Sequence, residues 1–375
     1  MKRAKTVYLG LLAINDKKEA IILPSIEREP LEEVLRGYDI KVLGVRNESY
    51  KDKKGVWWVQ TPQGSRILKK LSYSEETLRH ILHATRHLTG NGINMPAIIK
   101  TKAGKEYMLI DGVCFVLSEA IKGKNPSYNS PQELSKIIRE LARFHAASLG
   151  FVPDPESKPK VHLGTWIQDY EEQLEDMNGF YHKEASKETR DAVGELIVKE
   201  FPYFYKRGLD AVKGLKGHEY SEWVKKAAKA GCLCHQDFAA GNLIMDDAGS
   251  IYILDTDSLT VDISARDIRK LLNKIMKKAG RWDADLTSRF IKHYQSENSL
   301  SRSEWMVVKL DLLFPHLFIG AMNKYCYKRE KEWNAGKYLQ RLKEMAAFEK
   351  TAECVLSNFE SMVDKVLKSN IERTE

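Results

Sequence analysis

Short apolar runs separated by polar turns characterise residues 38–70. In "YDIKVLGV", "GVWWVQT" and "GSRILKKL" apolar side chains recur at close to every second position, and "PQG" separates the last two. This spacing is typical of half-buried strands joined by hairpins. The later runs "AIIKT", "EYMLI" and "CFVLSEAI" have the same character. We therefore expect a mainly antiparallel sheet within residues 31–121.

A helical pattern interrupts these predicted strands once. In "SEETLRHILHATRHL" the residues Leu78, Ile81, Leu82 and Leu88 lie near one face of a helix. Residues 31–121 are accordingly predicted to form a small β-rich lobe with one helix. Residues 1–30 are set apart as an N-terminal extension of uncertain structure.

Helical spacing dominates the chain after residue 121. Ser130, Pro131 and Glu133 form a helix start, in which the serine accepts from the third helical amide and the glutamate reaches back. Residues 165–229 and most of the chain beyond Ser264 are helical in pattern. We predict an α+β fold whose large helical lobe, residues 122–375, carries a polar loop at 234–257.

Composition and charge narrow the class of protein. The 375 residues contain 60 Lys and Arg against 52 Asp and Glu, but the basic residues are scattered. No basic run with interleaved aromatic residues supports nucleic-acid binding. An anionic substrate or surface suits the sign of the charge equally well.

Cysteine usage and the N-terminus indicate a reducing compartment. The five cysteines are odd in number and are not spaced as a disulfide framework. The N-terminal segment imitates a secretion signal, but Gly10 interrupts its apolar run and no small-residue cleavage site follows. No stretch approaches the roughly 20 apolar residues of a membrane span. We expect synthesis in the cytoplasm, no signal peptide and no membrane span.

The stretch "CHQDFAAGNLIMDDAGSIYILDTDS" holds the densest candidate chemistry. Asp237 and Asn242 are five residues apart, and Asp255 follows the predicted strand "SIYIL". Phosphoryl transfer from a nucleotide needs a carboxylate that deprotonates the acceptor hydroxyl and oxygen ligands that hold magnesium on the phosphates. The alternative is ordinary turn chemistry, since Asp and Asn are common turn formers.

A zinc site is a weaker alternative. Cys232, Cys234 and His235 are of the right ligand types, but C-x-C-H lacks a second ligand pair and lies on a predicted strand whose side chains alternate.

Four other residues have two interpretations each. Asp267 in "SARDIRK" favours a helix cap over a substrate contact. Trp166 and Tyr170 are expected to pack in the core, although they could line an acceptor pocket. Asp257 is either a second metal ligand or an acceptor that stabilises its loop.

Five ordered segments resemble a known family. "His235-Gln-Asp237-x-x-x-x-Asn242" followed by "Leu254-Asp255-x-Asp257" resembles the aminoglycoside phosphotransferase and choline kinase group of the protein-kinase-like superfamily. "FVLSEAIKG", "LARFHAAS", "LGTWIQDYEEQL", "LCHQDFAAGNLI" and "DISARDIRKLLNK" are similar to the bacterial spore-coat CotS family within that group. The resemblance covers the chain from about residue 31. It implies a bilobal protein-kinase-like fold with a small antiparallel-sheet N-lobe and a large helical C-lobe.

The resemblance assigns roles in the helical lobe. Asp237 would be the catalytic base, Asn242 a metal ligand and Asp255 the principal magnesium aspartate. His235 would support the loop rather than react. Gln236 stands where regulated protein kinases carry arginine, which disfavours control through a phosphorylated activation loop.

The resemblance also assigns roles in the β-rich lobe, with ATP as cofactor. Lys69 would contact the α- and β-phosphates. Lys70 is the weaker candidate, because its side chain points to the opposite face of the strand. The segment that ends at Glu119 and Ile121 would be the hinge whose backbone meets adenine.

Two parts of the family pattern are missing. Gly44 and Gly55 are far apart and form no G-x-G-x-x-G loop, and His83 stands where a glutamate should pair with the strand lysine. The nearest carboxylates, Glu75 and Glu76, lie at the start of the predicted helix.

The implied function is transfer of the ATP γ-phosphate to a hydroxyl of a small molecule or glycan. The acceptor would bind between residues 163–181 and the C-terminal helices, and other spore-coat proteins are expected partners. The alternative is a catalytically weak or inactive kinase-like structural protein of the coat. Coat localisation, after synthesis in the mother cell, follows from the resemblance alone.

Overall fold

The computed structural model describes residues 29–51, 54–330 and 332–371. Contacts group them into two compact units: residues 29–78 with 96–121, and residues 79–95 with 122–371. Helix α2 (Glu75–Gly90) contributes to both units. Nearly all of the predicted N-terminal extension, including the segment that imitates a secretion signal, lies outside the described residues.

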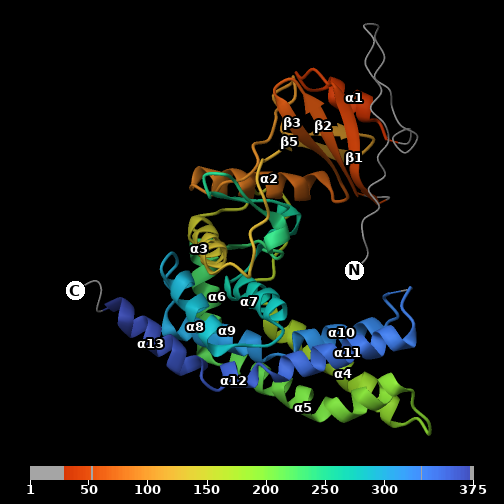
Figure 1. The fold of residues 1–375 in the computed structure, drawn as a ribbon, viewed down its shortest axis with the longest axis vertical. Coiled ribbons are helices and arrows are strands. Elements are labelled where there is room, and N and C mark those ends of the chain that lie inside the picture. Colours follow the sequence, from red (N-terminus) through yellow and green to blue (C-terminus); the bar gives the residue numbers. More distant parts are fainter. Residues whose placement is uncertain (1–28, 52–53, 331, 372–375) are drawn as a thin grey trace. The chain divides into compact units, whose positions relative to one another are not determined.

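The first unit is built on a five-stranded antiparallel sheet, as predicted (Figure 1). The strand order is β1-β2-β3-β5-β4. The bounds are β1 Gly44–Lys51, β2 Lys54–Thr61, β3 Gly64–Leu71, β4 Met108–Ile110 and β5 Val113–Glu119. Strand β3 therefore lies between β2 and β5, which fixes the register of the lysines that it carries.

Two details of this unit differ from the sequence prediction. Residues 38–43 and 97–101 are not strands and make only isolated bridges. A second helix, α1 (Leu31–Arg36), was not predicted, because its six residues are too few for a periodic pattern to stand out.

The core of the first unit lies between α1 and one face of the sheet. Its buried side chains come from α1, β2, β3 and β5 and include Leu31, Val34, Leu35, Trp57, Val59, Leu68, Phe115 and Leu117. Because side chains alternate along a strand, Lys70 shares the face of Leu68 whereas Lys69 lies on the other face. The Lys70 ammonium donates to the Glu29 carboxylate and lies 5.6 Å from the centre of the Tyr50 ring.

Helices form most of the second unit. Their bounds are α3 Pro131–Ala147, α4 Trp166–Ala185, α5 Ala192–Leu215, α6 His218–Ala230, α7 Ala265–Ala279, α8 Ala284–Gln295, α9 Arg302–Leu313, α10 His316–Cys326, α11 Ala335–Lys350, α12 Glu353–Leu356 and α13 Phe359–Ile371. Ser130 caps α3 as predicted, accepting from the Glu133 amide at 3.3 Å. The Glu133 carboxylate does not reach back to Ser130, and accepts from the Ser127 amide at 2.7 Å instead.

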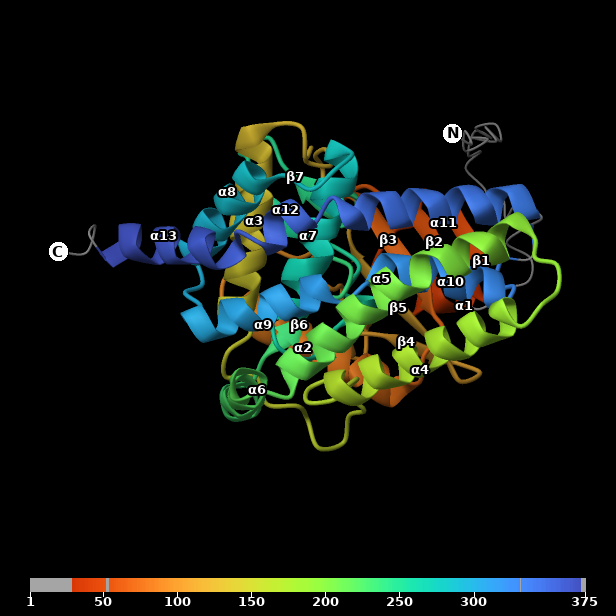
Figure 2. The ribbon, with the colours of Figure 1, turned by 90° about the horizontal axis from the view of Figure 1, so that it is seen from below.

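Helices α4, α5, α10 and α11 lie side by side (Figure 2). By length and hydropathy alone, the stretch Arg302–Cys326 could cross a membrane. Pro315 separates it into α9 and α10, and 61% of its apolar window is buried within the structure. Packing inside the second unit thus accounts for its composition.

Two short strand pairs hold the predicted polar loop. Strand β6 (Leu233–Cys234) pairs with β9 (Thr260–Val261), and β7 (Leu243–Met245) pairs with β8 (Ile251–Ile253). Residues 235–242 connect β6 to β7, and Asp255 follows β8. The pairs therefore fix both ends of the polar loop within one unit.

His80 of α2 is buried without a hydrogen-bond partner in the described part of the chain. Its ring meets the edge of the Phe151 ring, with 5.6 Å between centroids. Burial, together with the charges of His83 and Lys160, lowers the pKa of His80 from 6.5 to about 4.

We expect His80→Leu to reduce the loss of stability in mild acid. Because the folded-state pKa of His80 is the lower one, the unfolded chain binds more protons between pH 6.5 and about 4, and stability falls as pH falls through this window. The loss assigned to His80 is about 2 kcal/mol at pH 5. Urea unfolding of both proteins at pH 7.5 and pH 5 checks this, and an equal response in the two would contradict it.

Candidate active site

The loop between β6 and β7 brings Asp237 and Asn242 together. The Asn242 side-chain amide donates to the carbonyl oxygen and to Oδ2 of Asp237, each at 2.9 Å. The Lys274 ammonium, from α7, donates to Oδ1 of Asp237 at 2.5 Å. Both carboxylate oxygens thus have a donor that fixes their orientation, while 55% of the side chain stays exposed.

The Asp237 carboxylate is held in its ionised form. Partial burial acts to raise its pKa, but the hydrogen bond and charge of Lys274, together with Asn242, outweigh this and lower the pKa. An ionised carboxylate that remains open to solvent can accept the proton of an approaching hydroxyl. Lys274 was not among the predicted site residues.

His235 is buried behind the loop and does not face solvent. Its Nε2 lies 2.9 Å from the Leu254 carbonyl oxygen, and its Nδ1 accepts from the Asp237 amide at 3.3 Å. These partners suit a neutral ring protonated on Nε2, and burial lowers the pKa of His235 accordingly. The placement fits the supporting role assigned from the resemblance.

Asp267 anchors the loop, and the helix-cap prediction for it is wrong. It lies in the first turn of α7, after the N-cap Ser264, and only 1% of it is exposed. Its carboxylate accepts from the main-chain amides of His235 at 2.5 Å and Gln236 at 2.8 Å, and lies 3.3 Å from Nε2 of His145. Asp267 therefore fixes the main chain of His235 and Gln236, the first two residues of the loop.

Gln236 and Asp255 both have left-handed backbone conformations, with φ of 69° and 58°. Such residues cost about 1–3 kcal/mol each and cluster at functional sites. Gln236 is held by the Lys270 ammonium, which donates to its carbonyl oxygen at 2.9 Å and to its Oε1 at 2.6 Å. Its side-chain nitrogen donates to Thr260 Oγ1 at 2.6 Å.

Asn242 and Asp255 carry the oxygen atoms that the resemblance assigns to magnesium. The Leu254 amide donates to the Asn242 carbonyl oxygen at 2.9 Å, and Asp255 is the residue after Leu254. The Asn242 nitrogen faces Asp237, which leaves Oδ1 as its remaining donor atom for a cation. Carboxylate and amide oxygens are ligands that hard divalent cations prefer.

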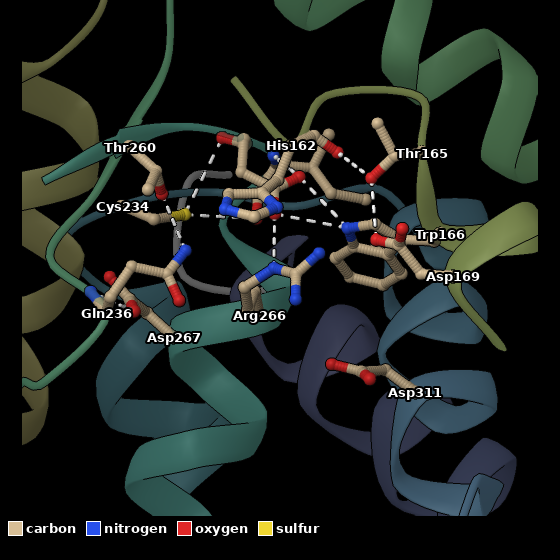
Figure 3. Close-up of polar contacts among 12 residues, drawn as sticks. His162, Thr165, Trp166, Asp169, Cys234, Gln236, Thr260, Arg266, Asp267 and Asp311 are labelled. Carbon is tan, nitrogen blue, oxygen red and sulfur yellow. Dashed lines mark hydrogen bonds and ion pairs between the residues drawn. The ribbon is translucent and has the colours of Figure 1, made fainter. Parts of the chain in front are cut away.

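A polar cluster that includes Trp166 and Arg266 lies near Gln236 of the loop (Figure 3). Trp166 Nε1 donates to both carboxylate oxygens of Asp262 at 3.1 Å, and the Arg266 guanidinium donates to the same carboxylate. Tyr170 donates to Asp311 at 2.5 Å. Trp166 and Tyr170 are at most 1% exposed, so they pack in the core as expected and do not line an open acceptor pocket.

The buried neighbourhood of Cys234 does not support a zinc site. Ligand atoms of His145, Cys234 and Asp267 lie within 4.8 Å of one another. They are already engaged, however: Asp267 accepts from loop amides, and the Cys234 thiol donates to the Ile263 carbonyl oxygen at 3.2 Å. Burial raises the pKa of the Cys234 thiol well above its usual value, which disfavours the thiolate that zinc requires.

The predicted nucleotide-binding residues lie in the first unit. Lys69 pairs with Val116 on β5, on the face of the sheet opposite Lys70. Glu119 ends β5, and its amide donates to the Ala97 carbonyl oxygen at 2.9 Å. Ile121 follows two residues later, at the end of this unit.

The two departures from the family pattern have different outcomes. The tip between β1 and β2, where a glycine-rich loop was sought, contains residues 52–53, which lie outside the described residues. His83 is bound elsewhere: its Nε2 lies 3.0 Å from the Val152 carbonyl oxygen. Glu75, at the start of α2, accepts from the Tyr107 hydroxyl.

Comparison with known proteins decides the family. The family model described as "Spore coat putative kinase YutH" matches residues 44–359. The chain belongs to this YutH spore-coat family. Spore coat protein S of Bacillus subtilis (strain 168) is 30% identical over 340 residues, covering 91% of this chain and 96% of that protein. The relationship to spore-coat CotS expected from the sequence is confirmed.

Solved structures show the fold of this YutH-family chain. An aminoglycoside phosphotransferase from Alicyclobacillus acidocaldarius subsp. acidocaldarius DSM 446 has a TM-score of 0.75 at 17% identity, over 94% of this chain and 99% of that one. Amicoumacin kinase hAmiN, solved in complex with AMP-PNP, Ca2+ and Ami, has a TM-score of 0.54 at 18% identity, over 85% and 92%. The predicted bilobal protein-kinase-like α+β fold is confirmed.

Proposed function

We propose that this chain is a magnesium-dependent phosphotransferase of the spore coat, which moves the γ-phosphoryl group of ATP to a hydroxyl of a small molecule or glycan. One observation carries the proposal: an ionised Asp237, oriented by Asn242 and Lys274, faces solvent on a loop that Asp267 anchors. A turn without this function does not require a buried carboxylate to fix two consecutive amides.

Asp237 would accept the proton as the acceptor oxygen bonds to the γ-phosphorus and the bond to the bridging oxygen breaks, releasing ADP. Asn242 and Asp255 would hold magnesium, whose charge, when it is bound, neutralises the phosphate oxygens. His235 would keep the loop in place through its contact with the Leu254 carbonyl oxygen.

The β-rich unit would bind the rest of ATP. Lys69 would contact the α- and β-phosphates, and the position of Lys70 supports this choice, because Lys70 is engaged with Glu29 on the α1 face. Backbone groups of Glu119 and Ile121 would contact adenine. Spore-coat localisation is supported by the family and by the relative named Spore coat protein S.

The second candidate is a structural protein of the coat with little or no catalysis. His83 favours it, since this residue stands where the family places a glutamate for the strand lysine and is bound to the Val152 carbonyl oxygen. Self-association without any response to nucleotide would be its signature, with other coat proteins as partners.

A melting scan with ATP and magnesium tests the proposal. A ligand at 100 times its dissociation constant stabilises the folded state by about 2.7 kcal/mol, so the wild type should melt at a higher temperature. Asp255→Ala should lose the magnesium-dependent part of this shift. Asp247→Ala, an exposed change in the β7–β8 turn, is the matched control and should behave as wild type. Cooperative melting with no shift in any of the three would favour the structural candidate.

A further inference from the structure

Helix α7 carries further basic side chains beyond the one that contacts Asp237. Lys274 contacts Oδ1 of Asp237, and Lys277 lies about one turn further along the same helix. The charged groups that face Lys277 are Arg341 and Glu349 from α11, with Lys274 and Arg269 from α7 itself. Lys274, Lys277 and Arg341 are called the basic patch below.

Helix α11 is held against the end of α7 at a defined place. The Trp282 amide, just beyond α7, donates to Thr351 Oγ1 at 3.0 Å, and the rings of Trp282 and Phe348 are 6.3 Å apart. Arg341 precedes Phe348 by seven residues, or about two helical turns, and therefore lies on the same face of α11. Phe348 on that face meets Trp282, and the charge of Arg341 acts on Lys277, so Arg341 lies near the end of α7.

The charges of the patch away from Asp237 are not neutralised. Neither Lys277 nor Arg341 has an ion pair or a side-chain hydrogen bond within the described residues, although both are half-buried. The acid that acts on Lys277, Glu349, is buried and accepts from the Leu317 amide at 2.7 Å. Burial raises the pKa of Glu349 to about 7, and its Oε2 lies 3.9 Å from Nη1 of Arg207, with which it shares its charge. By contrast, Arg266 and Arg269 on the same helix are paired with Asp262 and Asp311.

The direction of acceptor entry follows from the two oxygens of Asp237. Oδ2 is occupied by Asn242, which is on the side of the proposed magnesium and phosphates. Each oxygen thus has one donor, and with magnesium and phosphates on the Asn242 side the hydroxyl would approach Oδ1, next to the Lys274 ammonium. Lys277, about one turn beyond Lys274 on α7, would then be one of the basic groups near the rest of the acceptor.

We propose that the basic patch selects an anionic acceptor: a hydroxyl compound with a carboxylate or phosphate group a few bonds from the reacting oxygen. This inference rests on the proposed phosphotransferase function and names the acceptor class of that same site. An anionic group would pair with Lys277 and Arg341 and leave Lys274 on Asp237. A cationic acceptor would place like charge against all three.

Matched acceptors test the inference. Glucose, glucuronate, glucose 6-phosphate and glucosamine share one ring, and glycerol, glycerate and glycerol 3-phosphate share one backbone. With ATP and magnesium we measure ADP release and the phosphorylated product for each. At least one anionic member should exceed its neutral match about 10-fold or more in kcat/KM, since a hydrogen bond between charged groups discriminates by that order. Carboxylate and phosphate members distinguish the two sources of charge.

Substitutions in the basic patch test whether it causes the preference for anionic acceptors. Lys277→Gln and Arg341→Gln should each lower the ratio of anionic to neutral kcat/KM about 10-fold, an effect that a merely structural role would not produce. Lys278→Gln removes the same charge from the exposed neighbouring position of α7 and should leave the ratio unchanged. Melting scans report whether each variant is folded. The comparison of acceptors with the wild-type protein tests the inference even if a variant does not fold.

The outcomes separate this inference from the proposed function. Transfer to a neutral or cationic acceptor as fast as to its anionic match would overturn the anionic acceptor and leave the phosphotransferase intact. Magnesium-dependent ADP release that no anionic acceptor accelerates above the rate with water would have the same meaning. A protein that neither binds nor turns over ATP would remove the proposed function, and the inference with it.

Discussion

Asp237→Asn is expected to lower the rate of phosphoryl transfer by about 10² to 10⁴ and to leave the protein folded. The change keeps the size of the side chain but removes the group that takes the hydroxyl proton. Its structural cost is small, because the lost ion pair with Lys274 is partly exposed, and such pairs contribute about 0–1 kcal/mol.

Product formation at saturating ATP, with the best acceptor of the matched panel, measures the effect. Asp247→Asn makes the same chemical change at an exposed position in the same segment, and should retain the wild-type rate. If Asp237→Asn kept half of the wild-type rate or more, Asp237 would not be the base.

Asp267→Ala is expected to lower the free energy of unfolding by about 3–5 kcal/mol, the range for removing one partner of a buried charged network. The main-chain amides of His235 and Gln236 would lose their acceptor in a buried place, and His145 would lose its carboxylate. Burial acts to raise the pKa of Asp267, but the hydrogen bond with His145 and the nearby Lys270 outweigh it and lower the pKa, so the contribution of Asp267 is present at neutral pH and is lost on acidification.

Urea unfolding at pH 7 distinguishes an anchor from a cap. Asp283→Ala is the matched control, since Asp283 caps α8 by accepting from the Leu286 amide at 2.8 Å. A lost cap costs about 1 kcal/mol. Equal losses in the two variants would return Asp267 to the capping role that the sequence favoured.

Sequence spacing located the residues of the site that are close along the chain. Asp237, Asn242 and Asp255 lie in one hairpin region, and the structure links that region through the Leu254 amide. Asp267 and Lys274 could not be placed in the same way, because their contacts depend on how α7 packs against the loop. The sequence did hold one indication of their role. Asp267, Lys270 and Lys274 are spaced by three and four residues, which places three charged side chains on one face of the amphipathic helix α7.

The strand prediction for residues 38–43 failed for a different reason. Periodicity reports which side chains are buried, not which amides are paired. Ile40 and Val42 do pack against the core of the first unit, at alternate positions, but the backbone there has no continuous ladder. The short helix α1 escaped notice because its three buried residues, Leu31, Val34 and Leu35, span barely more than one turn.

The pairing of Lys70 with Glu29 bears on where a shortened gene can begin. The two side chains are only 12% and 5% exposed, and the Tyr50 hydroxyl also donates to the Glu29 carboxylate, at 2.6 Å. A recombinant fragment starting at Leu31 would look complete by family resemblance, yet it would strip a buried ammonium of this counter-ion. Lys69 immediately precedes Lys70 on the same strand. Trimming two residues too many would therefore disturb the strand that the nucleotide is proposed to meet, and an inactive fragment would say nothing about the enzyme.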